Sequence, residues 1–147
     1  MTQLQGSANS LRNLPDASDQ AGFERIRALV VDDSAPAQEA VCGLLALAPR
    51  VEVVGRAGNG VEAIAAVASL DPELVIMDVN MPYLDGLKAC SILTRNYPDL
   101  TVLLMSAEES DQLREAGLRH GAHAFLPKQH LIPGLPAAIR ELFPGRA

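Results

Sequence analysis

The sequence predicts a doubly wound α/β fold in which a five-stranded parallel sheet is covered by five helices. Short apolar runs alternate five times with longer stretches whose apolar residues recur every three or four positions, the pattern of parallel strands joined by helical crossovers. Hydrophobic residues make up 48% of the chain and aromatic residues only 3%, so the core must be aliphatic, as suits buried parallel strands. The 147 residues leave room for one such domain.

The expected strands and helices alternate along the chain. Strands are expected at 26–32, 51–55, 73–78, 100–106 and 122–127, and helices at 36–48, 60–70, 86–97, 110–120 and 134–143. Pro36 suits the first turn of the first helix, and Pro49 ends that helix. Asp85 and Gly86 open the third helix, and we expect only a turn and a cap from them. Two prolines and a glycine within 133–136 leave a short run for the last helix.

The domain boundaries follow from composition. Residues 1–24 are rich in Gln, Asn, Ser, Asp and Gly and lack periodicity, so we expect a flexible N-terminal tail. The domain then spans 25–143, and 144–147 form its C-terminal end or the start of a linker. Met1 without an evident tag favours a stand-alone protein over a piece of a longer one. Without a signal peptide or an apolar run of transmembrane length, we expect a cytoplasmic protein that makes no membrane contact.

Polar and charged side chains stand where four of the expected strands end. Asp32 and Asp33 follow the first strand, Asp78 ends the third, Ser106 ends the fourth, and Lys128 follows the fifth. The carboxyl ends of parallel strands share one edge of the sheet, so these side chains should converge there. Charged groups are costly at the ends of buried strands, which indicates a common purpose.

This set of groups suits phosphoryl chemistry at a metal. The three carboxylates supply the hard oxygen ligands that Mg²⁺ (or Mn²⁺) takes. Asp78 is the best candidate nucleophile, because a carboxylate can form an acyl phosphate when a metal and a cation neutralise the transferring oxygens. Lys128 would pair with one such oxygen, and Ser106 would donate a hydrogen bond to another. The net charge of −6 and the absence of clustered Lys and Arg argue against nucleic-acid binding.

The chain resembles the receiver domains of two-component response regulators, including the chemotaxis regulators, over about residues 25–143. The matching segments, in order, are Val31–Ser34, Met77–Pro82, Asp85–Gly86, Met105–Ala107 and Gly121–Lys128. The resemblance implies a flavodoxin-like sheet with the strand order 2-1-3-4-5. It also implies that Asp32, Asp33 and Asp78 hold Mg²⁺ together with the backbone carbonyl of Asn80.

The same resemblance assigns roles in switching. It makes Asp78 the phosphoacceptor and Lys128 the group that binds the phosphoryl oxygens, with Ser106 and Phe125 as the switch pair. Ser106 would move toward the phosphoryl group, and the ring of Phe125 would turn into the vacated space. The family often has proline after the lysine, in a cis bond, whereas Gln129 stands there in this chain. The geometry of that loop therefore stays open.

The function expected from the resemblance is phosphorylation-controlled signalling. The domain would accept a phosphoryl group from a histidine kinase or a histidine phosphotransfer protein and catalyse only its own phosphorylation and dephosphorylation. A downstream protein would bind the face made by the fourth helix, the fifth strand and the fifth helix, and a homodimer is left open.

Three alternatives remain. The chain could be the receiver part of a longer regulator whose output domain is missing. A small metal-dependent phosphohydrolase would share the nucleophile, but such enzymes usually have a second acid where Asn80 stands. A flavodoxin-like cofactor binder would need a phosphate loop after the first strand, where Asp32 and Asp33 would repel phosphate.

Overall fold

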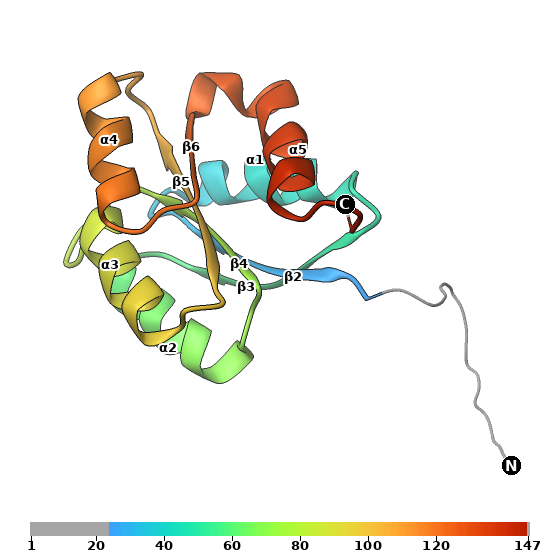
Figure 1. Ribbon diagram of the computed structural model, residues 1–147, viewed down its shortest axis with the longest axis horizontal. Helices are drawn as coiled ribbons and strands as arrows, with labels where there is room; N and C mark the ends of the chain where they lie inside the picture. Colours follow the sequence, from blue (N-terminus) through green and yellow to red (C-terminus); the bar gives the residue numbers. More distant parts are fainter. Residues whose placement is uncertain (1–23, 147) are drawn as a thin grey trace, which may run out of the picture.

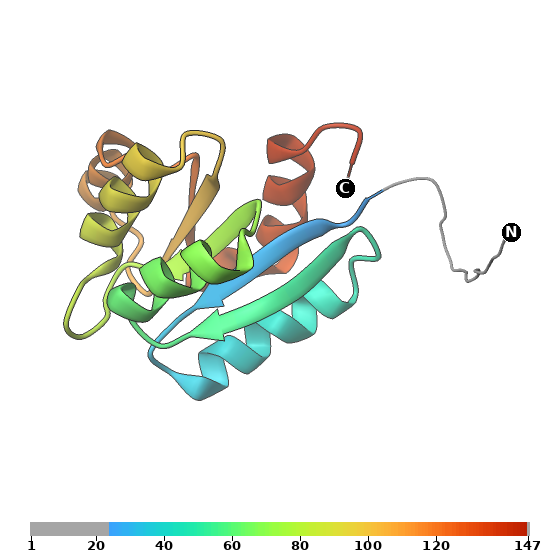
Figure 2. The same cartoon turned by 90° about the horizontal axis from the view of Figure 1, so that it is seen from below.

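The computed structural model describes residues 24–146 and has a parallel five-stranded sheet between two layers of helices (Figures 1 and 2). The elements in chain order are β2 (Ile26–Val31), α1 (Ala35–Ala46), β3 (Val51–Ala57), α2 (Gly60–Leu70), β4 (Leu74–Asp78), α3 (Gly86–Asn96), β5 (Thr101–Ser106), α4 (Asp111–Arg119), β6 (Ala124–Pro127), the 3₁₀ helix η3 (Lys128–His130) and α5 (Leu131–Leu142). The sheet order β3-β2-β4-β5-β6 is 2-1-3-4-5 when the strands are counted along the chain, so the expected fold class and strand order are confirmed.

The core has two halves, one on each face of the sheet. Helices α2, α3 and α4 cover one face, where Val67, Leu93 and Phe125 pack against Val75 and Leu104. Helices α1 and α5 cover the other face with an equally aliphatic cluster. Strand β4 lies between β2 and β5 and is buried along its whole length. No helix within residues 24–146 is both long enough and apolar enough to cross a membrane.

Side-chain caps fix where four of the helices begin. Each cap oxygen accepts a hydrogen bond from a backbone N–H in the first turn, which is typically worth about 1 kcal/mol. The capping residues are Ser34 for α1, Asn59 for α2, Asp85 for α3 and Ser110 for α4. The capping role expected of Asp85 is therefore present, with its Oδ1 atom 2.9 Å from the backbone nitrogen of Lys88.

Prolines shape the chain from β6 onward. Pro127 is the last residue of β6, an edge strand, where a missing N–H is tolerated. Ile132 and Pro133 have non-helical dihedral angles, so the regular part of α5 begins at Gly134, as the sequence predicts. Pro136 then lies in the first turn, where backbone N–H groups have no helical partner. The cis peptide within residues 24–146 is Ile132–Pro133, so the bond after Lys128 is trans.

Candidate functional site

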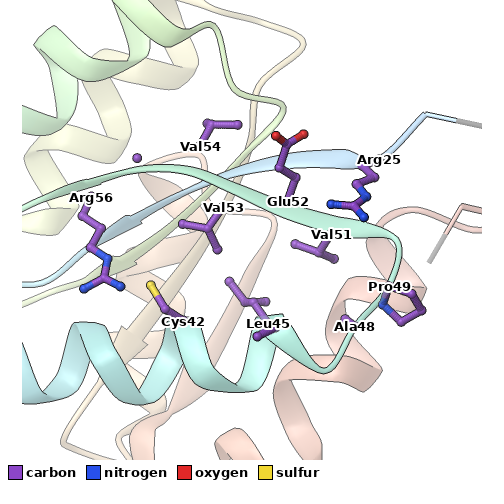
Figure 3. A pocket seen from close by; sticks show the side chains of 12 residues that line it. Arg25, Cys42, Leu45, Ala48, Pro49, Val51, Glu52, Val53, Val54 and Arg56 are labelled. Atoms are coloured by element: carbon purple, nitrogen blue, oxygen red, sulfur yellow. The ribbon is translucent and has the colours of Figure 1, made fainter. Parts of the chain in front are cut away.

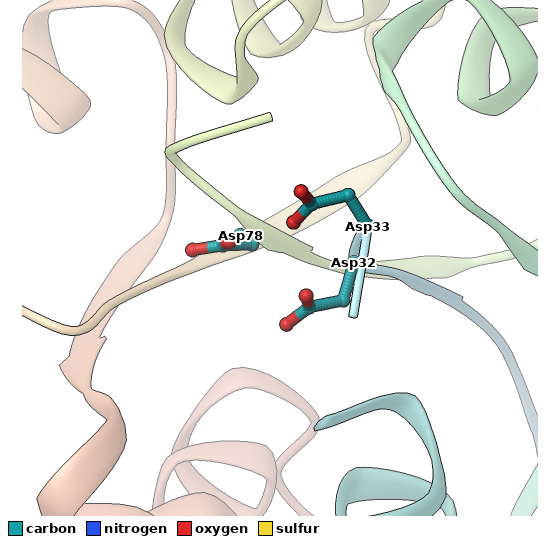
Figure 4. Close-up of side chains that lie close together, drawn as sticks. All are labelled: Asp32, Asp33 and Asp78. Atoms are coloured by element: carbon teal, nitrogen blue, oxygen red, sulfur yellow. The ribbon is translucent and has the colours of Figure 1, made fainter. Parts of the chain in front are cut away.

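Three carboxylates meet at the carboxyl ends of two adjacent strands. Asp32 and Asp33 directly follow β2, and Asp78 ends β4. One oxygen from each side chain lies within 4.8 Å of the other two (Figure 4). From β2 the chain crosses to β3 on one side and later to β4 on the other, so this is the point where ligands bind in doubly wound sheets.

Lys128 brings a positive charge to the same edge from the segment after β6. Its Nζ atom lies 2.8 Å from Oδ2 of Asp32 and 3.5 Å from Oδ2 of Asp78. Asp32 is fully buried and Asp78 is only 5% exposed, whereas Asp33 is exposed. Four of the five side chains that the sequence predicted at this edge, the three carboxylates and the amine, therefore lie together.

Burial and the neighbouring charge of Asp32 oppose ionisation of the Asp78 carboxyl. Burial raises the pKa of the Asp78 carboxyl above its ordinary value, and the charge of Asp32 adds to the effect, against the opposing influence of Lys128 and the backbone N–H of Asn80. Burial also opposes the charged form of Lys128, but its hydrogen bond to Asp32 and the two carboxylate charges outweigh burial and raise its pKa. Lys128 thus stays protonated at neutral pH.

Asp78→Asn is expected to stabilise the metal-free protein by an amount that depends on pH. The folded state holds the Asp78 proton more tightly than the unfolded chain does, so the carboxyl costs stability only once the pH rises through its ordinary pKa of 3.8 toward the raised value. The difference in free energy of unfolding between Asp78→Asn and the parent should grow over that window and then level off. Urea unfolding in chelating buffer measures it, and a difference independent of pH would contradict the placement of Asp78.

The backbone around Asp32 is held by a residue that the sequence did not single out. Gln38 on α1 donates from Nε2 to the carbonyl oxygens of Asp32, at 2.7 Å, and of Ala57, at 2.9 Å. The backbone N–H of Ser34 donates to Oδ1 of Asp32 at 2.9 Å. Gln38 thereby ties the ends of β2 and β3 together beneath the carboxylates.

Ser106 and Phe125 lie on the same face of the sheet. Phe125 pairs in register with Leu104, and Ser106 is two residues further along β5, so its side chain points to the same side. Ser106 is fully buried, and its Oγ atom accepts a hydrogen bond from the N–H of Glu108 at 3.0 Å. The Phe125 ring is already buried, with the Arg114 guanidinium 5.3 Å from its centre.

The loop after Asp78 approaches the strand end closely. The N–H of Gly86 donates to the carbonyl of Val79 at 2.8 Å. A Cβ atom at Gly86 would collide with the carbonyl oxygen of Asp78 and lie 2.8 Å from Cα of Val79. Within this loop Tyr83 has a φ of 70°, a conformation that costs a bulky residue about 1 to 2 kcal/mol.

The acidic cluster fits a divalent cation of the Mg²⁺ type. Its three carboxylates face a single ammonium group, which leaves an excess of two negative charges. Carboxylates about 4 Å apart repel by roughly 1 kcal/mol in water and about 4 kcal/mol at the effective dielectric of a protein surface. Hard oxygen donors with excess negative charge are the ligands that Mg²⁺ takes. Asn80, an exposed residue two positions after Asp78, could add a backbone carbonyl oxygen.

A hollow between α1 and the edge strand β3 is a weaker candidate for a functional site, because few of its side chains are reactive (Figure 3). Cys42, Arg56 and Arg25 line it together with mostly aliphatic residues. Burial raises the pKa of the Cys42 thiol, so at neutral pH it is neither a good nucleophile nor a good metal ligand. Arg56 is paired with Glu39 at 2.9 Å. The acidic edge is therefore the better candidate site.

Comparison with known proteins agrees with this fold. The family model of the response regulator receiver domain matches residues 28–140. The chain is 30% identical over 130 residues to the transcriptional regulatory protein DegU of Brevibacillus brevis, covering 88% of this chain and 55% of that protein. Over 112 residues it is 40% identical to a protein-glutamate methylesterase/protein-glutamine glutaminase of Methanosarcina mazei, covering 75% and 31%. The signal receiver domain of NarL from Mycobacterium tuberculosis superposes with a TM-score of 0.77 at 30% identity, covering 84% of this chain and 100% of that one.

The fold and the match define a signalling domain of two-component systems. The chain belongs to the response regulator receiver domain family, which confirms the resemblance found in its sequence motifs. It spans 55% of the first of these curated relatives and 31% of the second. The transcriptional regulation and the methylesterase and glutaminase activities in the names of these relatives are properties of those longer proteins.

Proposed function

We propose that Asp78 accepts a phosphoryl group and that the resulting acyl phosphate switches a protein-binding face. The observation that carries this proposal is the meeting of three carboxylates and Lys128 at the strand-order reversal. In the proposed site Asp32, Asp33, Asp78 and the backbone carbonyl of Asn80 hold Mg²⁺ or Mn²⁺. When bound, the ion supplies positive charge that offsets the charge on the phosphoryl oxygens.

The proposed donor is a phosphohistidine of a histidine kinase or a phosphotransfer protein. A carboxylate oxygen of Asp78 forms the bond to phosphorus while the bond from phosphorus to the imidazole nitrogen breaks, and the imidazole keeps the electron pair. Lys128 is already within 3.5 Å of Asp78 and would pair with a phosphoryl oxygen. The domain would catalyse only this transfer and the later hydrolysis.

Ser106 and Phe125 are the proposed route from the site to the output face. The Oγ atom of Ser106 now accepts a hydrogen bond from the Glu108 N–H, and its hydroxyl would donate to a phosphoryl oxygen. The Phe125 ring is already buried, so it does not have to rotate inward from a solvent-exposed position. The change would instead reach α4 through Arg114, which covers the ring and donates to the carbonyl of Phe125 at 3.2 Å.

The proposed partners follow from this arrangement. A downstream protein would bind the face made by α4, β6 and α5, and self-association through the same face would give a homodimer. We propose no nucleic-acid or membrane contact for this domain itself, and we place it in the cytoplasm with its kinase.

Incubation with acetyl phosphate and Mg²⁺ tests the proposed function. The intact mass of the parent should rise by a single phosphoryl group, and Asp78→Asn should show no adduct. Omission of Mg²⁺ should slow the parent at least tenfold, because uncompensated carboxylates repel the incoming donor. An equal adduct on Asp78→Asn would refute the assignment of Asp78.

A further inference from the structure

Tyr83 stands out because its backbone is strained while its side chain is almost fully exposed. Within residues 24–146, the non-glycine residues with positive φ are Asp71 and Tyr83. Asp71 is the left-handed C-cap of α2, which is an ordinary place for that conformation. Tyr83 caps no helix, and its side chain is 89% exposed, so little packing offsets the backbone strain.

The loop that carries Tyr83 is fastened on both sides. The N–H of Leu84 donates to the carbonyl of Pro82 at 2.8 Å, and the N–H of Gly60 donates to the carbonyl of Leu84 at 3.1 Å. The contact between Gly86 and the end of β4 closes the loop. The backbone that carries the exposed Tyr83 side chain is therefore fixed by hydrogen bonds.

Two other exposed apolar residues lie on the loop of Tyr83 and on the segment hydrogen-bonded to that loop. Pro82 precedes it and is exposed. Val61 follows Gly60 at the start of α2, where it is 58% exposed, and Gly60 packs against Leu84 of the loop. We call Val61, Pro82 and Tyr83 the rim patch. An exposed aromatic ring held beside a charged site suits contact with a partner protein.

A protein that delivers a phosphoryl group to Asp78 docks close to Tyr83. Tyr83 is three residues from Gly86 and so within about 11 Å of it, and Gly86 contacts the backbone of Asp78. A standard protein interface covers about 800 Å² on each partner, which as a disc centred on Asp78 has a radius of about 16 Å. A small donor such as acetyl phosphate has no such footprint.

We propose that Tyr83 is an anchor for the histidine phosphodonor protein and sets how well that donor is recognised. The ring offers a large apolar face and a polar tip at little cost in conformational entropy, as tyrosines at the centre of interfaces do. Its occupant is the surface around the phosphohistidine of the donor. This inference rests on the proposed function, because it presupposes that Asp78 is the acceptor.

The test compares a small donor with protein donors. A panel of autophosphorylated histidine kinases is first tried on the parent, and the kinase that labels it fastest is kept. That kinase and acetyl phosphate are then each used to phosphorylate the parent, Tyr83→Gly, Tyr83→Phe and Leu47→Asn. Glycine removes both the ring and the strain, and phenylalanine keeps the ring. Leu47 is a matched control, because it is 81% exposed and lies at the C-terminal end of α1, outside the rim patch.

Tyr83→Gly should accept the phosphoryl group from the kinase at least tenfold more slowly than the parent, while its rate with acetyl phosphate stays within twofold. Tyr83→Phe and Leu47→Asn should match the parent with both donors. Equal rates with the kinase, or equal losses with both donors, would overturn the role of Tyr83. The role of Tyr83 would also be overturned if acetyl phosphate labels the parent but none of the kinases does. If the parent takes no phosphoryl group from either donor, the proposed function itself has failed.

Discussion

Gly86→Ala is expected to lower the free energy of unfolding by about 2 to 3 kcal/mol and to slow phosphorylation about 100-fold. The added Cβ would collide with the carbonyl oxygen of Asp78 and lie 2.8 Å from Cα of Val79. Both are backbone atoms at the end of a fully buried strand, so they cannot move aside cheaply. Relief of the collision shifts the strand end or the start of α3, and either shift changes the surroundings of the Asp78 carboxylate.

Gly43→Ala is the matched control for this substitution. Gly43 lies inside α1, and a Cβ there would meet no atom within 4 Å. The alanine should raise the free energy of unfolding by about 0.5 to 1 kcal/mol and leave phosphorylation unchanged. Urea unfolding and the rate with acetyl phosphate measure both effects. A Gly86→Ala protein as stable and as reactive as the parent would show that the loop does not position Asp78.

Asp33→Asn should have opposite effects on stability with and without metal. Within residues 24–146 Asp33 makes no ion pair, so the substitution removes repulsion from Asp32 and Asp78 without breaking a contact. The metal-free protein should gain about 1 kcal/mol, which raises the melting temperature by roughly 4 °C for a domain of this size. The parent should gain about 1.4 kcal/mol at a Mg²⁺ concentration ten times its Kd, and the variant should gain far less.

Glu52→Gln controls for the loss of one negative charge. Glu52 is exposed on β3 and pairs in register with Arg27 near the start of β2, at the opposite end of the strands from the carboxylates. This variant should keep the full stabilisation by Mg²⁺. The same gain from Mg²⁺ in Asp33→Asn as in the parent would remove Asp33 from the metal site.

The fold and the acidic edge could be predicted because they depend on local pattern and on topology. Asp32 and Asp78 each end an apolar run, and parallel strands bring such ends to one edge whatever the loops do. Pro36, Pro49 and Asp85 marked helix ends through local backbone chemistry, and the structure differs from those predictions by a few residues at most.

The remaining features depend on contacts between distant segments. Gln38 looks like an ordinary helix residue until the ends of β2 and β3 lie beside it. The buried position of the Phe125 ring depends on how Arg114 and α4 pack over it. The left-handed conformation of Tyr83 is set by the hydrogen bonds that fasten its loop, whereas local sequence rules expect glycine or asparagine there.

Reduction of the phosphorylated protein with borohydride identifies the residue that carries the phosphoryl group. Borohydride converts an aspartyl phosphate into homoserine and leaves free carboxylates unchanged, so peptide sequencing by mass spectrometry identifies the acceptor. We expect homoserine at position 78 after incubation with acetyl phosphate and Mg²⁺, and at least tenfold less after the same time without Mg²⁺. Homoserine in place of Asp32 or Asp33, or a phosphate on Ser106 that survives reduction, would show that Asp78 is not the phosphoacceptor.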